Sequence, residues 1–249
     1  MFRKLINLTG LLLVVGFLIA TVVFTSRENK NSICSKIEVN FRQNDIIKAT
    51  ENEIISVVRA VDNQIVGKPL KHINAEEIEQ EIEKLKAIEK AEVYKVMIRD
   101  GTSFTGVLSI KVKHREPLVR VMSTNGNYYL DKTGNKFPVS INYTANVLTV
   151  TGMIDEEVAV NKLIPFVMYV ENNDFWKAQI QQIHVRNDGD ALLIPLVGDQ
   201  IIELGSFDNY ERKLRNMRAF YEQVLAKNNW DKYRTISVKY DNQVIAKKR

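Results

Sequence analysis

The sequence has a single cysteine, Cys34, and its three histidines are far apart along the chain. One thiol can form no disulfide within the chain, and these residues do not have the spacing of zinc ligands. The folded part must therefore be held together by core packing, with Cys34 as a small buried residue or one without a role. Repeats and low-complexity segments are also lacking.

Motifs of common catalytic sites are missing as well. The sequence contains no P-loop, no Gly-x-Ser-x-Gly and no Gly-x-Gly-x-x-Gly. The triplet KTG at residues 132–134 matches one motif of penicillin-binding transpeptidases, but no serine has a lysine three residues later to complete their nucleophile motif. We interpret the triplet as part of a turn. We assign no residue to catalysis, a cofactor or a metal, and expect a protein that is not an enzyme.

The charge of the chain is mild and scattered. Its formal net charge is +5 at pH 7, and 26% of its residues are charged. A nucleic-acid-binding protein would need lysine and arginine clustered on one face, and the sequence has no such run. We therefore expect no nucleic-acid partner.

A long apolar run stands at the N-terminus. Residues 8–24 read LTGLLLVVGFLIATVVF, which is about the length needed to cross a bilayer. A cleaved signal peptide is the alternative, but the run is long and has no Ala-x-Ala site. We therefore expect an uncleaved inner-membrane anchor. Arg3 and Lys4 precede it and favour a cytoplasmic tail at 1–7. A polar stalk at 25–36 would connect the anchor to a folded part outside the cytoplasm.

The next segment, residues 37–113, predicts a small α+β unit. Alternating residues predict a strand at 37–41, and Thr50 and Asn74 each begin a helix with a glutamate three residues later. The apolar period then changes to two, which predicts two more strands that end near 113. We expect two helices over one face of a three-stranded sheet.

The remaining residues, 114–249, predict a mainly β domain with two helices. Residues 155–170 form an apolar helix that Pro165 kinks or delays, and residues 208–225 form the second helix. Residues 235–246 predict one last strand at a sheet edge. Such an edge can accept a strand from another chain, or Lys239 and the basic tail can guard it against such pairing, and the sequence leaves both interpretations open.

Four short motifs follow one another in the order of a known family. Residues 112–117 read VKHREP, similar to an Arg-x-Pro junction between two domains. Residues 128–137 read YYLDKTGNKF, similar to a hairpin with tyrosine, aspartate and glycine. Residues 202–205 (IELG) precede the long helix, and residues 236–243 (ISVKYDNQ) lie near the terminal strand. Together they resemble the bacterial cell-division family FtsQ, called DivIB in Gram-positive bacteria, over essentially the whole chain.

The resemblance implies a POTRA-like domain over residues 37–113 and an FtsQ-type β domain over 114–249. It also implies a non-enzymatic scaffold, enriched at the division septum, that binds FtsB-like and FtsL-like proteins and other divisome components and couples them to wall synthesis. FtsB would bind by strand addition near the terminal strand. The residues that the resemblance places at the partner are Ser237, Val238, Lys239, Tyr240 and Gln243, and those at the domain junction are Arg115 and Pro117.

One motif departs from the family pattern. The family's terminal strand often reads Asp-Leu-Arg-Tyr, whereas this chain keeps only Tyr240. A POTRA-bearing adaptor for protein export or envelope assembly is the alternative function, although such proteins usually carry several POTRA units or a membrane barrel. A wall hydrolase or transferase of unfamiliar type is a third possibility.

Overall fold

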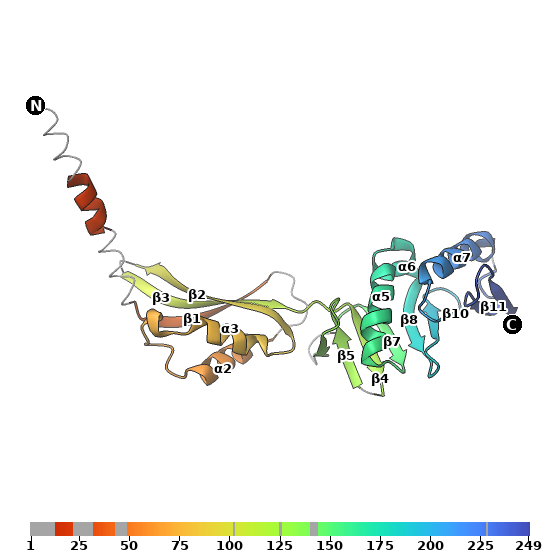
Figure 1. The fold of residues 1–249 in the computed structure, drawn as a ribbon, viewed down its shortest axis with the longest axis horizontal. Helices are drawn as coiled ribbons and strands as arrows, with labels where there is room; N and C mark the ends of the chain where they lie inside the picture. The colour runs from red at the N-terminus through yellow and green to blue at the C-terminus, as the bar shows by residue number, and fades with distance from the viewer. Residues whose placement is uncertain are drawn as a thin grey trace, which may run out of the picture. The chain divides into compact units, whose positions relative to one another are not determined.

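The computed structural model describes residues 13–21, 32–42, 49–101, 103–124, 126–139, 144–227 and 229–249 (Figure 1). The chain divides into two compact units, one that ends at His114 and one that begins at Arg115. Both units combine helices with a β-sheet, and the second is mainly β, which confirms the expected α+β class.

The N-terminal anchor is only partly covered by the described residues. Residues 13–21 are helical and their side chains are exposed. The rest of the expected span, 8–12 and 22–24, lies outside the described residues, as do the expected tail at 1–7 and residues 25–31 of the stalk expected at 25–36. The last stalk residues, 34–36, belong to the first strand of the first unit instead. Among the helices that the structure describes, none has both the length and the apolar character needed to cross a bilayer.

The first unit follows the order strand, helix, helix, strand, strand. Its elements are β1 (Cys34–Phe41), α2 (Glu51–Val61), the 3-10 turn η1 (Leu70–His72), α3 (Ala75–Glu83), β2 (Ile88–Asp100) and β3 (Ser103–His114). The sheet order is β1-β3-β2, with β1 parallel and β2 antiparallel to β3. Helices α2 and α3 cover one face of this sheet (Figure 1).

The two helices begin where the sequence predicts. The Thr50 hydroxyl accepts from the Glu53 amide while the Glu53 carboxylate accepts from the Thr50 amide, which completes a capping box. Asn74 caps α3 by accepting from the Glu77 amide. Apolar residues at helical spacing, such as Ile54 of α2, are fully buried against the sheet.

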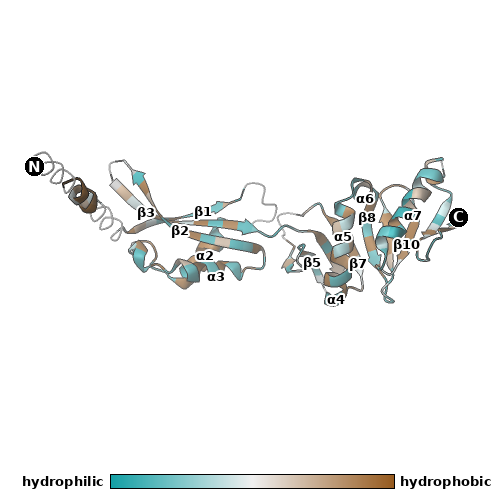
Figure 2. Cartoon of the chain, turned by 45° about the horizontal axis from the view of Figure 1, so that its top comes forward, coloured by the Kyte–Doolittle hydropathy of each residue, from teal (hydrophilic) through white to brown (hydrophobic). Residues whose placement is uncertain are grey.

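The second unit is a nine-stranded mixed sheet with helices. Its strands are β4 (Val119–Ser123), β5 (Gly126–Leu130), β6 (Lys136–Pro138), β7 (Leu148–Gly152), β8 (Ile180–Val185), β9 (Ala191–Pro195), β10 (Ile201–Gly205), β11 (Tyr233–Ser237) and β12 (Ile245–Lys248). Their order in the sheet is β12-β11-β10-β9-β8-β7-β4-β5-β6. Strands β6 and β12 therefore form its two edges. Buried and less buried residues alternate along strands such as β4 and β9, because one face packs under helices; Figure 2 shows the hydropathy along the strands.

The helices of the second unit are α4 (Glu156–Val158), α5 (Ile164–Glu171), α6 (Asp174–Gln179) and α7 (Tyr210–Gln223), with the 3-10 turn η3 (Leu225–Lys227) after α7. A π-helical turn, η2 (Ala159–Leu163), joins α4 to α5, so the interruption predicted from Pro165 lies immediately before that residue. Helix α6 was not predicted. It has only six residues, so the apolar period of a helix is not visible there.

An aromatic cluster fills the core between α6, α7 and the sheet. Tyr221 is 3% exposed and makes edge-on ring contacts with Phe175, Trp176 and Trp230. Burial raises the pKa of Tyr221 to about 12. The neutral phenol is therefore favoured in the folded state.

This pKa predicts an alkaline loss of stability. Below pH 10 the phenol is protonated in both states, and its contribution is fully present. Between pH 10 and 12 only the unfolded chain loses the proton, so the free energy of unfolding should fall, by about 2.5 kcal/mol at most. Urea unfolding followed by tryptophan fluorescence measures this, since both tryptophans, Trp176 and Trp230, lie in the second unit. In Tyr221→Phe the fall over this pH range should be smaller by that amount, and an unchanged fall would contradict the assignment.

Candidate partner-binding edge

The C-terminal segment forms two strands and a turn in place of the single strand expected over 235–246. Strand β11 ends at Ser237, and β12 begins at Ile245 and runs back antiparallel to it. On its other side β11 pairs in parallel with β10, which α7 connects to it. The chain reverses through Asn242, whose φ of 60° is left-handed and suits an asparagine in a turn. The expectation that residues 238–240 form the sheet edge is therefore wrong, and β12 is the edge strand.

The first two expected partner residues are inside the fold. Ser237 is 7% exposed, and its hydroxyl has no hydrogen-bond partner among the described residues. Val238 is 1% exposed, and its amide donates to the carbonyl oxygen of Glu203 at 2.9 Å. This amide is thus used within the unit, so proline at position 238 would not delete a donor on an outer edge, as the sequence suggested.

The next residues hold the turn in place. Lys239 is exposed, and its ammonium pairs with the Asp190 carboxylate, which raises the pKa of the lysine. Its aliphatic stem lies over Gly205, where a Cβ would come within 2.7 Å of Lys239 Cγ. Arg212 of α7 pairs with Asp241 in the same turn. The ion pairs anchor the turn to neighbouring segments of the second unit.

Tyr240 and Gln243 are, with Lys239, the expected partner residues that the structure leaves accessible. Tyr240 is 52% exposed, and Gln243 is exposed in the turn before β12. Neither belongs to a strand, because β11 has ended and β12 has not begun. They lie on the segment that leads into the edge strand.

Strand β12 has an unpaired outer side in the described sheet. The Arg249 amide donates inward to the carbonyl oxygen of Lys232 at 3.2 Å. Since amide direction alternates along an antiparallel pair, the amides of Ala246 and Lys248 point away from β11. Ile245 and Lys247, on one face of the strand, are both exposed, whereas Ala246 packs against the core. The strand therefore offers two outward donors beside an apolar and a cationic side chain.

Each of the two units matches a known protein family. Residues 32–99 match the family described as POTRA-like domain, and residues 116–247, more than half of the chain, match the family described as FtsQ/DivIB, C-terminal related. The chain belongs to the FtsQ/DivIB family. No curated protein matches it. Proteins of the FtsQ/DivIB type are non-enzymatic cell-division proteins, so the chain is a member of a division-scaffold family.

The junction residues of this FtsQ/DivIB protein lie against a hairpin of the second unit. The Arg115 guanidinium pairs with the Asp131 carboxylate at 2.9 Å between Nη1 and Oδ2, and both side chains are largely buried. Pro117 is half-buried just before β4. The pair joins the first residue of the unit to the turn between β5 and β6.

Asp131 organises this turn, which the sequence predicted without assigning a partner to its carboxylate. Its Oδ1 accepts from the Thr133 amide, the Thr133 hydroxyl and the Asn135 amide, and its Oδ2 accepts from the Asn135 side chain. Burial by itself would raise the pKa of Asp131, but these donors outweigh it and lower the pKa below its usual value. The sequence signal was an aspartate two residues before threonine and three before glycine, which is typical of an Asx-type turn. The triplet at 132–134 thus forms a turn, as predicted.

Cys34 and His114 are both enclosed in the first unit of this FtsQ/DivIB chain. Cys34 is fully buried, as expected, and burial raises the pKa of its thiol. His114 is 1% exposed and accepts from the Ala49 amide through Nε2 at 2.8 Å. Among the described residues, no three His, Cys, Asp or Glu side chains gather in a way that could hold a metal ion.

Proposed function

We propose that this protein is a membrane-anchored scaffold of the bacterial division machinery. Residues 8–24 would anchor it in the inner membrane with the N-terminus in the cytoplasm, and the two folded units would stand outside at the septum. Family membership supports the general role. The scaffold would bind FtsB-like and FtsL-like proteins and connect them to septal wall synthesis.

The observation that carries the partner site is the unpaired outer side of β12. A strand from an FtsB-like protein would extend the nine-stranded sheet by pairing with the outward amides of Ala246 and Lys248. The side chains of the added strand would contact Ile245 and Lys247 on the exposed face of β12. Cross-strand pairing favours an apolar residue opposite the first and an acidic residue opposite the second. Tyr240, Gln243 and Lys239 would border this site and would not supply its backbone pairing.

Proline at position 248 tests the edge directly. Lys248→Pro deletes an outward amide and no inward bond, and proline is tolerated on an edge strand in this position. We expect at least about tenfold less FtsB-like protein to co-purify with the full-length variant, which corresponds to roughly 1.4 kcal/mol of binding free energy. Lys248→Thr removes the same charge but keeps the amide, so it should capture the partner within about twofold of the original protein.

Two outcomes would contradict the strand-addition site. One is full capture by Lys248→Pro with tryptophan fluorescence unchanged, which would mean that the outward amide is not used. The other is an equal loss in Lys248→Thr, which would assign the effect to the charge. The scaffold role itself is tested separately, by septal enrichment of a fluorescent fusion of the full chain and by failure of division when the protein is depleted.

A further inference from the structure

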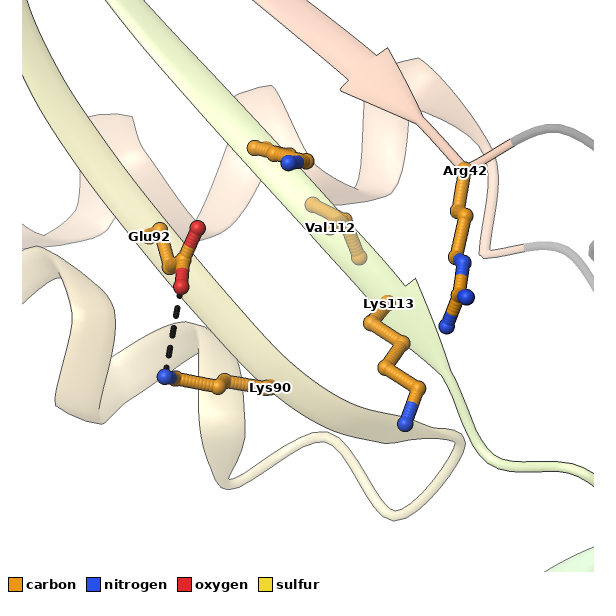
Figure 3. A pocket seen from close by; sticks show the side chains of 6 residues that line it. Arg42, Lys90, Glu92, Val112 and Lys113 are labelled. Atoms are coloured by element: carbon orange, nitrogen blue, oxygen red, sulfur yellow. Dashed lines mark ion pairs between the residues drawn. The ribbon is translucent and has the colours of Figure 1, made fainter.

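A basic groove lies on the open face of the first unit's sheet, opposite its helices (Figure 3). Its volume is about 290 Å³. The residues that line it are Arg42, Lys90, Glu92, Lys111, Val112 and Lys113. They come from the end of β1 and from β2 and β3, so segments that are far apart in the sequence contribute to one surface.

The two-residue period of the strands gathers these cations. Leu108, Ile110 and Val112 are fully buried beneath the helices, so Lys111 and Lys113 project from the other face of β3. The antiparallel register places Lys113 opposite Lys90. Like charges directly opposite one another destabilise a sheet slightly, so core packing alone gives no reason for this arrangement.

The acidic side chains around the groove are already engaged. Glu92 accepts from the Tyr94 hydroxyl at 2.7 Å and pairs with Lys90 at 3.2 Å, and these contacts lower its pKa. Lys113 pairs with Glu89. Arg42 and Lys111 form no side-chain hydrogen bond or ion pair with any residue that the structure describes, but Lys111 stands opposite Glu92 in the ladder and its charge also lowers the pKa of that carboxyl group. Four cations and one carboxylate line the groove, so its field is positive.

The geometry favours a ligand that is held by charge alone. The central strand β3 pairs with both β1 and β2. On the edge strand β2, the Ala91 amide donates to Glu83 and the Val93 amide donates to Glu79, so these groups are not available to a bound peptide. Among the described residues that line the groove, none has an aromatic ring on which a nucleotide base could stack. Lys111 and Lys113 stand two residues apart, roughly 6.6 Å along the strand, and neighbouring strands are about 4.8 Å apart. A polymer with closely spaced charges can therefore meet several cations at once.

We propose that this groove binds a phosphate-bearing polyanion through Arg42 and Lys111, with Lys90 and Lys113 at its sides. The arginine fork can bind two phosphate oxygens, and the lysines act as point charges. This site is separate from β12 and does not depend on the partner proposed above.

The test uses the full-length protein in detergent and linear inorganic polyphosphate as the probe. Arg42→Gln/Lys111→Gln should bind it at least about tenfold more weakly, and the slope of log affinity against log salt should fall by about two. The matched control is Arg215→Gln/Lys227→Gln, which removes the same charge from exposed positions in the second unit. It should bind within about twofold of the original protein.

The other results overturn the proposal. Equal affinity of the groove variant and the control variant would mean that the groove is not the site, and so would failure of the original protein to bind polyphosphate. Tighter binding of polyglutamate or of single-stranded DNA than of polyphosphate, lost in the same variant, would assign the groove to an acidic peptide or to nucleic acid. Unchanged far-ultraviolet circular dichroism in both variants shows that the comparison is between folded proteins.

Discussion

Proline at position 238 is expected to unfold the second unit rather than to weaken partner binding selectively. The Val238 amide donates to the Glu203 carbonyl oxygen, and the side chain is 1% exposed in the core. Val238→Pro would leave that carbonyl without its partner, force the ring toward it and remove buried apolar volume. We expect the free energy of unfolding to fall by about 4 kcal/mol, a large share of the stability of an ordinary domain. Urea unfolding of the full chain, followed by tryptophan fluorescence, measures it.

The matched control for this change is Val238→Ala. Alanine keeps the amide and loses only apolar volume, so we expect it to lower the free energy of unfolding by about 2 kcal/mol. If Val238→Pro is as stable as Val238→Ala but no longer captures the partner, then the amide faces outward in solution and the edge assignment to β12 is wrong. Val238→Pro is expected to lower the stability of the fold, whereas Lys248→Pro is expected to lower partner capture with the fold intact.

Alanine at position 152 is expected to have the largest effect on stability. Gly152 ends β7 with φ of 100°, and a Cβ there would stand 1.9 Å from the carbonyl oxygen of Val185 on the paired strand. The same oxygen accepts from the Met153 amide at 3.0 Å, so it cannot move without breaking that bond. Gly152→Ala therefore requires two central strands to separate. We expect a loss of about 4 kcal/mol or more, seen as failure to accumulate folded protein or as a lower urea midpoint.

Gly189→Ala separates this collision from backbone strain. Gly189 also has a positive φ, 83°, but a Cβ added there would have no neighbouring heavy atom within 4 Å. We expect it to lower the free energy of unfolding by only about 1 kcal/mol. Equal losses in the two variants would show that strain of φ, and not the approach of β7 to β8, makes glycine necessary at 152.

Much of the fold could be predicted from local pattern. The caps at Thr50 and Asn74, the helix after residue 208 and the turn at 132–134 each depend on residues a few positions apart. Such residues interact in the same way in many proteins, so their signals are visible in the sequence. Helix α6 was missed because its six residues are too few to display an apolar period.

The candidate site was predicted less well, for a physical reason. Residues 235–246 alternate well enough to resemble one strand, and only the turn at Asn242 divides them. Whether this segment pairs once or twice depends on Glu203, which accepts the Val238 amide from more than thirty residues away in sequence. No pattern within the segment contains that information. The ion pair between Arg115 and Asp131 was not predicted for the same reason, because it joins two segments that are separate in the sequence.

The sequence by itself determined most of the helices and strands, the apolar face of those elements, and the family that the chain resembles. All three follow from interactions within a few residues or from short motifs in a fixed order. Only the tertiary structure decided that β12 is the edge, that Val238 is enclosed, and that cations from three strands share one groove. These depend on the register and pairing of distant segments, which the packing of the whole unit selects.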